Sequence, residues 1–561
     1  MNQLIECVPN FSEGRDMGII RQITHEIEST EGVKLLNVDP GKATNRTVVT
    51  FVGPPAAVIE AAFRAIRKAS ELIDMSKHKG EHPRMGATDV CPLIPIAGIS
   101  MEETAVWAQK LGERVGKELG IPVYLYEAAQ KNKERSNLSV IRAGEYESFF
   151  KKIKLPEWKP DFGPVEHSVH AGSTVIGARD FLVAYNINLN TTSTRRANSI
   201  AFDVREAGRV KREGNPVTGK IVTDAKGNPV NIPGTLKSVK AIGWFIEEYG
   251  IAQISMNLTN IQITPVHVAF DEVCKKAGER GIRVTGSELV GLIPLNSLLE
   301  AGKYFLRKQQ RSTGVSEKEL VCMAIKSLGL DELSPFKPEE RIIEYLLRDK
   351  TKGKLAGMTL TSFADETASE SAAPGGGSIS AYAGALGVSL GTMVANLSAH
   401  KPGWDERWEE FSDWAEKGQA IKAGLLSLVD EDTHAFNKIM EAFALPKGTE
   451  PEKKIRTEAI QTATRYATEV PYQVMQLCFD SMSILRAMAL EGNPNSVSDA
   501  GVGALCARSG VMGAFLNVKI NASGLADKSF ASEIVEKGKS LEEKARAMET
   551  EILDIVNSKI K

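Results

Sequence analysis

The hydrophobic pattern of this chain changes near residue 330, and the change separates two kinds of fold. Before it, β-branched runs such as 46–53 alternate with amphipathic segments such as 55–74. Alternation with period two predicts strands, and apolar spacing of three and four predicts helices. Beyond residue 330, nearly every segment has helical spacing, including a last helix from about residue 528. We therefore predict an α/β half followed by an all-α helical bundle.

A chain of 561 residues is too long for one hydrophobic core. We expect two α/β subdomains at 1–180 and 181–327, a linker at 328–350 that is charged and punctuated by Pro and Gly, and a helical domain at 351–561. Turn signals and two short β-like runs predict an exposed hairpin insertion at 209–236. Further strands are expected at 34–41, 122–129, 181–190 and 250–261, and a further helix at 265–281.

Charge and cysteine content restrict the partners and the compartment. Lys and Arg total 69 and Asp and Glu total 71, which argues against a cationic face for nucleic acid or a membrane surface. The six cysteines are widely spaced and form no CxxC motif, so we expect free, reduced thiols. The first residues contain no basic stretch followed by an apolar one, so no secretory signal is expected and we predict a cytoplasmic protein.

The uncharged segment 379–399 allows two interpretations. It contains Gly387-x-x-x-Gly391, a spacing found in transmembrane helices. However, it is rich in Gly, Ala and Ser and lacks flanking aromatic residues and a basic cluster. We favour a closely packed helix of a soluble bundle, and the small residues make a homo-oligomer plausible.

His82, one of eight histidines, lies in a segment suited to proton transfer. Pro83 favours an extended backbone at His82, and Glu81 and Arg84 lie beside it, among glycines that allow a ligand to approach closely. An imidazole titrates near neutral pH and can both accept and donate a proton. A hydrogen-bonding surface or structural histidine is the alternative.

The acidic run 430–432 lies in a segment with helical spacing. Helical geometry places Asp432 on the same face as Phe436, directed toward the bundle interior, and turns Glu431 and His434 away. A buried acid costs free energy unless it is paired or functional. A solvated acidic face is the alternative interpretation.

The glycines Gly375, Gly376 and Gly377 precede the segment 379–399. Free N–H groups at a helix start favour anions, although the spacing is not that of a P-loop. A flexible loop that enters the helix is the alternative. Weaker polar candidates are Ser498, Asp499, Asn517 and Asn521, the last two being one helical turn apart.

Several strings in each half carry a resemblance to known enzymes. The segments CVPNFSEGRD (7–16), LLNVDPGKATNRTVVTFVG (35–53) and KHKGEHPRMGATDVCPLIP (78–96) resemble the N-terminal subdomain of glutamate formimidoyltransferase, and GARDFLVAYNINLN (177–190) and VTGSELVGLIPL (284–295) resemble its second subdomain. The segments APGGGSISAYAGALG, VDEDTHAFNKIMEAFALPKGT and GAFLNVKINA resemble the formimidoyltetrahydrofolate cyclodeaminase domain. In this order they resemble the bifunctional formimidoyltransferase-cyclodeaminase family, although the insertion at about 212–232 is longer than in the vertebrate form.

The resemblance implies a fold and an activity. The fold would be a ferredoxin-like α/β half of two subdomains, followed by a helical bundle. The activity would transfer a formimidoyl group from N-formimidoyl-L-glutamate to tetrahydrofolate and then form 5,10-methenyltetrahydrofolate with release of ammonia, in histidine degradation and one-carbon metabolism. Tetrahydrofolate, expected to be polyglutamylated, would be the cosubstrate. The histidines lack metal-site spacing, so no metal is expected.

The resemblance also implies roles for particular residues. His82 falls on the catalytic base of the first reaction and Asp432 on the proposed catalytic acid of the second. The span from Gly163 to Gly172 matches a folate-binding segment, with a bare linker as the alternative. The remaining residues expected to bind substrate or folate are Asn10, Asp39, Arg84, Gly375, Gly376 and Gly377.

Asp39 and Asn10 also have chemical reasons for these roles. The carboxylate of Asp39 suits the donor edge of an aminopyrimidine, although Asp39 can equally start a turn. Asn10, with Ser12 and Arg15 nearby, can hold carboxylates or an amidine, or simply form a turn. Two alternatives to the whole assignment stay open: a helical half that is a methenyltetrahydrofolate cyclohydrolase, and a non-enzymatic folate-binding scaffold.

Overall fold

The computed structural model describes residues 3–42, 44–80, 83–214, 219–347 and 353–560. The chain divides into two compact units. The first contains Met1–Ser297 and Leu328–Leu346, and the second contains Leu298–Ser327 and Leu347–Lys561. Residues 298–327, assigned to the second α/β subdomain on sequence alone, thus pack with the helical unit.

The first unit begins with a seven-stranded sheet in the order β1-β4-β2-β5-β7-β6, with β3 paired to β4. Its strands are β1 (Leu4–Cys7), β2 (Asn10–Phe11), β3 (Lys34–Gly41), β4 (Arg46–Gly53), β5 (Thr88–Ala97), β6 (Val123–Glu127) and β7 (Thr174–Ala178). The pairings are antiparallel except for those of β7, which runs parallel to both β5 and β6. The strands predicted at 34–41, 46–53 and 122–129 are confirmed.

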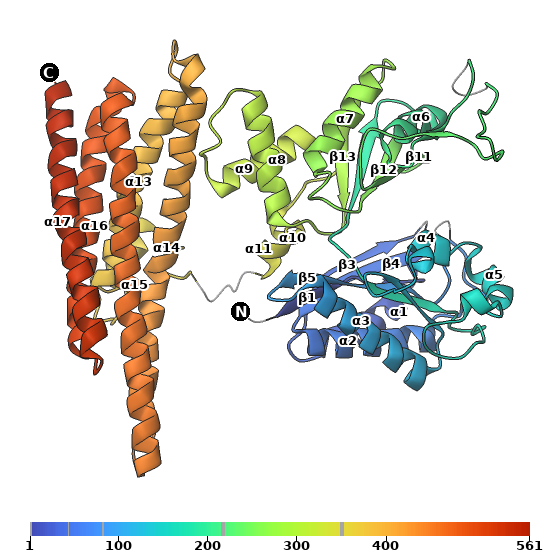
Figure 1. The fold of residues 1–561 in the computed structure, drawn as a ribbon, viewed down its shortest axis with the longest axis horizontal. Coiled ribbons are helices and arrows are strands. Elements are labelled where there is room, and N and C mark those ends of the chain that lie inside the picture. The colour runs from blue at the N-terminus through green and yellow to red at the C-terminus, as the bar shows by residue number, and fades with distance from the viewer. Residues whose placement is uncertain (1–2, 43, 81–82, 215–218, 348–352, 561) are drawn as a thin grey trace. The chain divides into compact units, whose positions relative to one another are not determined.

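Three helices cover one face of this sheet, namely α1 (Met17–Glu28), α2 (Pro55–Leu72) and α3 (Met101–Arg114) (Figure 1). The predicted helix at 55–74 is α2, which starts with a proline whose missing N–H costs nothing at a first turn. Its apolar stripe, including Val58, Ala62 and Ile66, is buried against the sheet. Two shorter helices, α4 (Leu138–Ile141) and α5 (Glu145–Lys152), follow β6.

A second sheet of the first unit has the order β11-β12-β8-β13 and is antiparallel throughout. Its elements are β8 (Val183–Leu189), α6 (Thr194–Val204), β11 (Val239–Ile246), β12 (Ile251–Leu258), α7 (Val266–Gly278) and β13 (Val284–Val290). The predicted strands at 181–190 and 250–261 and the helix at 265–281 are confirmed. The predicted hairpin insertion contains the antiparallel pair β9 (Arg209–Val210) and β10 (Asn231–Ile232). Two short helices, α10 (Pro338–Arg341) and α11 (Ile343–Leu347), complete this part of the chain.

The second unit is helical, as predicted. Its elements are α8 (Leu295–Lys308), α9 (Glu317–Leu328), α12 (Leu360–Thr367), α13 (Gly376–Ala399), α14 (Trp408–Ala444), α15 (Glu450–Glu491), α16 (Val497–Ser523) and α17 (Lys528–Lys559). The helices α13 to α17 run alongside one another as a bundle (Figure 1). One continuous core of residues such as Leu425, Met482 and Val511 holds them together.

Two helices of the described chain, α13 and the helical stretch Pro494–Ser523, are long and apolar enough to span a membrane. Of their most apolar windows, 61% and 50% respectively is buried inside the protein. Core helices of soluble bundles have the same length and composition, and Ala381, Val388 and Ala395 of α13 belong to the bundle core. The six cysteines are free, as expected.

Candidate active sites

His82, the predicted base, lies outside the described residues, but both of its flanking segments are described. On one side, His78 is buried, and its Nε2 lies 2.8 Å from the carbonyl oxygen of Asn45. A carbonyl can only accept, so His78 Nε2 carries the proton and donates it. Burial lowers the pKa of His78, which favours the neutral ring, and its Nδ1 has no hydrogen-bond partner among the described residues. His78 is therefore a neutral imidazole with an unused acceptor, four residues before His82.

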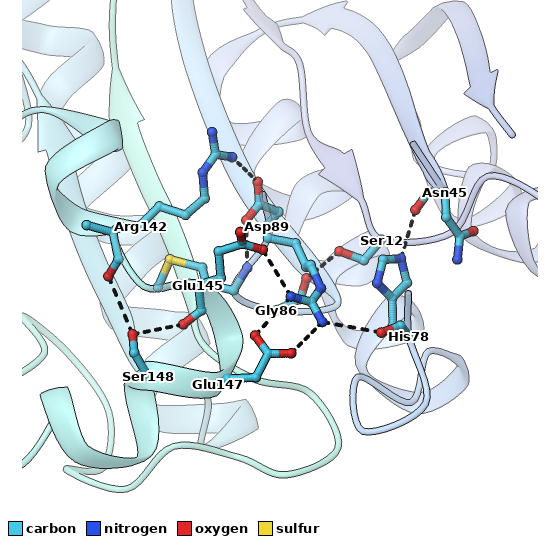
Figure 2. A network of polar contacts seen from close by, with 12 residues as sticks. Ser12, Asn45, His78, Gly86, Asp89, Arg142, Glu145, Glu147 and Ser148 are labelled. Carbon is cyan, nitrogen blue, oxygen red and sulfur yellow. Dashed lines mark hydrogen bonds and ion pairs between the residues drawn. The ribbon is translucent and has the colours of Figure 1, made fainter. Parts of the chain in front are cut away.

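On the other side, Arg84 belongs to a network of polar contacts whose partners His78, Glu145 and Glu147 are labelled in Figure 2. Its guanidinium donates to Glu145 at 3.0 Å, to Glu147 at 2.7 Å and to the carbonyl oxygen of His78 at 3.3 Å. Burial lowers the pKa of Arg84, but the bonds to Glu147 and Glu145 outweigh that effect and raise it. Arg84 thus tethers the segment that follows His82 to helix α5.

A second group of charged side chains, centred on Asp89, is linked to the residue that follows Arg84. Asp89, at the start of β5, is fully buried and accepts hydrogen bonds from both Arg46 and Arg142, each at 2.5 Å. Its other oxygen accepts the backbone N–H of Met85 at 2.9 Å. Asn10, a predicted binding residue, accepts from Arg46 Nε at 2.9 Å. Two guanidinium groups therefore share one carboxylate, and Asn10 is held in a fixed orientation beside them.

The predicted folate segment packs directly against the chain that follows Arg84. Gly172 forms a bridge with Gly86, and the N–H of Ser173 donates to the carbonyl oxygen of Met85 at 3.0 Å. A Cβ on Gly172 would lie 2.3 Å from that oxygen, and the positive φ of Gly163 and of Gly172 also favours glycine. The C-terminal end of 163–172 thus packs against Met85 and Gly86, which follow His82 by three and four residues in the sequence.

His167, inside this segment, has a structural environment. Its Nδ1 lies 2.7 Å from the hydroxyl of Ser173, and its ring packs among Tyr146, Phe149 and Phe150. Burial lowers the pKa of His167 to about 4, so the ring is neutral at physiological pH. This aromatic cluster anchors the segment.

Asp39 lies on β3, which continues past it to Gly41 instead of ending in a turn. Burial raises the pKa of Asp39, and Arg341 opposes that rise. No described residue donates a hydrogen bond to its carboxylate. Asp39 is therefore a partly buried acceptor that is available to a ligand.

In the helical unit, Asp432 on α14 is held by Ser378 in the first turn of α13. Asp432 Oδ2 accepts the backbone N–H of Ser378 at 2.9 Å and lies 3.1 Å from its hydroxyl oxygen. A Cβ at position 377 would lie 2.1 Å from Asp432 Oδ1, so only glycine allows this approach. Burial raises the pKa of Asp432, and the two bonds from Ser378 offset part of that rise. The result is an acid whose protonation equilibrium is moved toward neutral pH.

Asp432 opens onto a pocket of about 120 Å³ between α13, α14, α15 and α16. Besides Asp432, the pocket is lined by glycines and other small residues, two carboxamides and apolar side chains, namely Ala372, Ala373, Gly375, Gly376, Thr433, Phe436, Ile439, Ala467, Asn517 and Asn521. Phe436 is 39% exposed at this pocket and does not belong to the bundle core, which corrects its predicted inward position. The predicted residues Gly375, Gly376, Asn517 and Asn521 are thus brought together with Asp432.

The other members of the acidic run have structural partners. Asp430 accepts the backbone N–H groups of Leu355, at 2.9 Å, and Ala356, at 3.2 Å. Glu431 accepts a hydrogen bond from the hydroxyl of Tyr466 on α15. His434 is exposed, as predicted. Of the three adjacent carboxylates, only Asp432 lines the pocket.

The weaker candidates Ser498 and Asp499 do not join this pocket. Both lie in the first turn of α16, while Asn517 lies 18 residues beyond Asp499 along the same helix. At 1.5 Å per residue that separation is about 27 Å. In the described ranges, no group of three or more His, Cys, Asp and Glu residues could hold a metal ion.

Arg46, Arg142 and Ser378 are among the polar residues of these sites that were not predicted from the sequence. Arg46 opens a strand, and Arg142 lies 53 residues from its partner Asp89, so no local pattern links them. For Ser378, its position directly after three glycines at a helix start was an available signal.

Three family descriptions match consecutive parts of the chain. Residues 4–179 match the "Formiminotransferase domain, N-terminal subdomain", residues 184–348 the "Formiminotransferase domain" and residues 359–540 "Formiminotransferase-cyclodeaminase". The matches follow one another in the order that the sequence strings had indicated.

Individual relatives agree with these matches. The chain is 42% identical to the formimidoyltransferase-cyclodeaminase of Mus musculus over 99% of this chain and 98% of the relative. It is 42% identical to the glutamate formimidoyltransferase of Thermoplasma acidophilum over 54% of this chain and 92% of that protein. It is also 37% identical to the methenyltetrahydrofolate cyclohydrolase of Methylorubrum extorquens over 36% of this chain and 97% of that protein.

Proposed function

This chain belongs to the formimidoyltransferase-cyclodeaminase family, and from that premise we propose that it catalyses two consecutive folate-dependent reactions. The first transfers a formimidoyl group from N-formimidoyl-L-glutamate to N5 of tetrahydrofolate. The second closes the product to 5,10-methenyltetrahydrofolate and releases ammonia. The observation that carries the proposal is Asp432, a partly buried acid with a raised pKa at a pocket lined by glycines and carboxamides.

In the first reaction, N5 bonds to the amidine carbon while the bond from that carbon to the glutamate nitrogen breaks. His82 is proposed to take the proton that N5 loses and to give it to the departing nitrogen. Asp39 pairs with the aminopyrimidine edge of the pterin through its unused carboxylate. Arg84 bonds to His78, Gly172 pairs with Gly86, and Asn10 is held by Arg46; Asn10, Arg84 and the span from Gly163 to Gly172 are proposed to contact substrate and folate.

In the second reaction, N10 bonds to the formimidoyl carbon and the carbon–nitrogen bond to the former imino group breaks. The substrate itself holds N10 close to the carbon, so the protein supplies chiefly proton transfer. Asp432 is proposed to accept the N10 proton and deliver it to the departing nitrogen, which leaves as ammonia. Gly375, Gly376 and Gly377 let the folate approach the helix start closely.

The cosubstrate is proposed to be polyglutamylated, with no metal required, in a cytoplasmic homo-oligomer that binds neither nucleic acid nor a membrane. The near-zero net charge supports the proposed lack of nucleic-acid and membrane binding, and the Gly- and Ala-rich α13 supports self-association.

A coupled assay tests both activities. Purified full-length protein receives formimidoylglutamate and tetrahydrofolate, and methenyl absorbance and ammonia are followed for wild type, His82→Ala and Asp432→Asn. We expect His82→Ala to lose formation of the intermediate but to release ammonia from supplied 5-formimidoyltetrahydrofolate. Asp432→Asn should accumulate that intermediate and lose ammonia release by at least about 100-fold. Unchanged turnover in both variants would contradict the assigned chemistry.

The cyclohydrolase relative favours a second candidate for the helical unit, namely hydrolysis of methenyltetrahydrofolate. The same assay separates the two candidates. Ammonia release from 5-formimidoyltetrahydrofolate identifies a cyclodeaminase, whereas loss of methenyl absorbance without ammonia consumption or release identifies a cyclohydrolase.

A further inference from the structure

The α16 wall of the Asp432 pocket presents two carboxamides whose orientation is set by the backbone. Asn517 Nδ2 donates to the carbonyl oxygen of Gly513 at 3.0 Å. Asn521 Nδ2 donates to the carbonyl oxygen of Ala467 on α15 at 2.6 Å. Each bond uses one of the two N–H groups of its carboxamide and fixes which end of the side chain carries the oxygen, the acceptor that the other residues leave unused.

Both oxygens are available to a ligand. No described residue donates a hydrogen bond to Asn517 Oδ1 or Asn521 Oδ1. Neither oxygen is among the described polar atoms that are buried from solvent without a hydrogen-bond partner. Both residues line the same pocket as Asp432. A Cβ at position 376 would lie 3.3 Å from Asn517 Nδ2, so the start of α13 and this carboxamide confine the pocket from two sides.

We propose that Asn517 and Asn521 are specificity-determining residues that accept hydrogen bonds from the formimidoyl nitrogen of the folate intermediate. This inference rests on the proposed cyclodeaminase function. It assigns to α16 the recognition of the group that leaves, while Asp432 on α14 moves the proton.

The chemistry of the step explains why acceptors are needed at this place. The reacting amidinium carries two N–H groups on its terminal nitrogen. When N10 bonds to the carbon, the N10 proton passes to that nitrogen, which then carries three N–H groups as a protonated amine. The bond from carbon to this amine breaks, ammonia leaves and the positive charge remains on the methenyl group, so charge and atoms balance.

The polar groups of the pocket provide as many acceptors as the leaving amine has N–H groups. The carboxylate of Asp432 and the two carboxamide oxygens are three acceptors for the three N–H groups of the leaving amine. Because one N–H group is added only as the reaction proceeds, at least one of these bonds strengthens in the transition state. Apolar Phe436, Ile439 and Ala467 also line the pocket, and hydrogen bonds are stronger in such surroundings.

The same acceptors discriminate against a carbonyl group. A formyl group has an oxygen lone pair where the formimidoyl group has N–H, so it would face two oxygens without a proton between them. An unpaired polar group of this kind costs far more than a missing methylene. The α16 wall therefore selects an amidine nitrogen over a formyl oxygen on the same folate.

The test compares Asn517→Leu, which removes the acceptor, with Asn517→Asp, which keeps one. Each variant of the full-length protein is assayed for ammonia release from 5-formimidoyltetrahydrofolate and for inhibition by 5-formyltetrahydrofolate. Asn557→Ala, an exposed change on α17, is the matched control, and thermal unfolding verifies that each variant is folded. Asn521→Ala is measured in parallel because its loss also frees the carbonyl of Ala467.

We expect kcat for ammonia release to fall about 10- to 100-fold in Asn517→Leu, as for one lost hydrogen bond to a charged group. The formyl inhibitor should bind that variant as tightly as wild type or more tightly, and Asn517→Asp should retain most of the turnover. Equal weakening of turnover and inhibitor binding, or unchanged turnover in Asn517→Leu, would overturn the inference. A wild-type protein that releases no ammonia would instead overturn the proposed function itself.

Discussion

The hydroxyl of Ser378 offers a direct test of how the protein sets the protonation of Asp432. Burial raises the pKa of Asp432, and the hydrogen bonds from Ser378 favour its ionised form and lower it. Ser378→Ala removes the hydroxyl but keeps the backbone N–H, which lies 2.9 Å from Asp432 Oδ2. The pKa of Asp432 should therefore rise further.

The size of this rise follows from the geometry. A hydrogen bond to a charged group contributes about 1.5–3 kcal/mol. The single proton of Ser378 Oγ is divided between Val429 O, at 2.8 Å, and Asp432 Oδ2, at 3.1 Å. About half of the upper value, roughly 1.5 kcal/mol, corresponds to about one pKa unit.

The assay is the dependence of kcat on pH for ammonia release from 5-formimidoyltetrahydrofolate. Asp432 must be ionised to accept the N10 proton. Its higher pKa in Ser378→Ala should therefore shift the acid limb of the pH–rate profile to higher pH by about one unit. Ser389→Ala is the control, because Ser389 donates to a carbonyl of its own helix α13 and does not contact Asp432. An acid limb that stays in place, or that moves to lower pH, would refute the role assigned to Ser378.

Three further predictions concern stability and packing. Burial raises the pKa of Asp432, so its contribution to stability is present below the unfolded-state pKa and is lost as pH rises through the folded-state pKa. Replacing it by a neutral residue in Asp432→Asn should therefore raise the melting temperature at neutral pH. In acid, where Asp432 is itself neutral, this gain should disappear. Gly377→Ala should cost about 1–3 kcal/mol by forcing Asp432 away, whereas Gly375→Ala, whose added Cβ meets only an oxygen 3.9 Å away, should unfold thermally like wild type. Asp89→Asn leaves Arg46 and Arg142 without their carboxylate and should destabilise the first unit by about 3–5 kcal/mol, measured by urea denaturation with transferase activity as the readout; unchanged denaturation would contradict a structural role for this cluster.

Local patterns were sufficient for some of the elements that bury one face. The strand β4 and the helix α2 were predicted because their apolar residues recur with the period of their own backbone geometry. The strand β5 was not predicted, although it pairs with β1, β2 and β7. It contains Pro92 and Pro95, and proline in a run argues against a central strand because it cannot donate to the ladder.

The sequence alone determined the two fold classes and indicated Asp432 as the candidate acid, because helical periodicity and the resemblance both depend on residues close together in the chain. Only the tertiary structure decided which polar groups surround that acid. Ser378 and Asp432 are 54 residues apart, and Asn521 contacts Ala467 from a neighbouring helix at the same separation. Contacts of this kind depend on how helices pack, and packing is set by complementary side-chain shapes that no local pattern encodes.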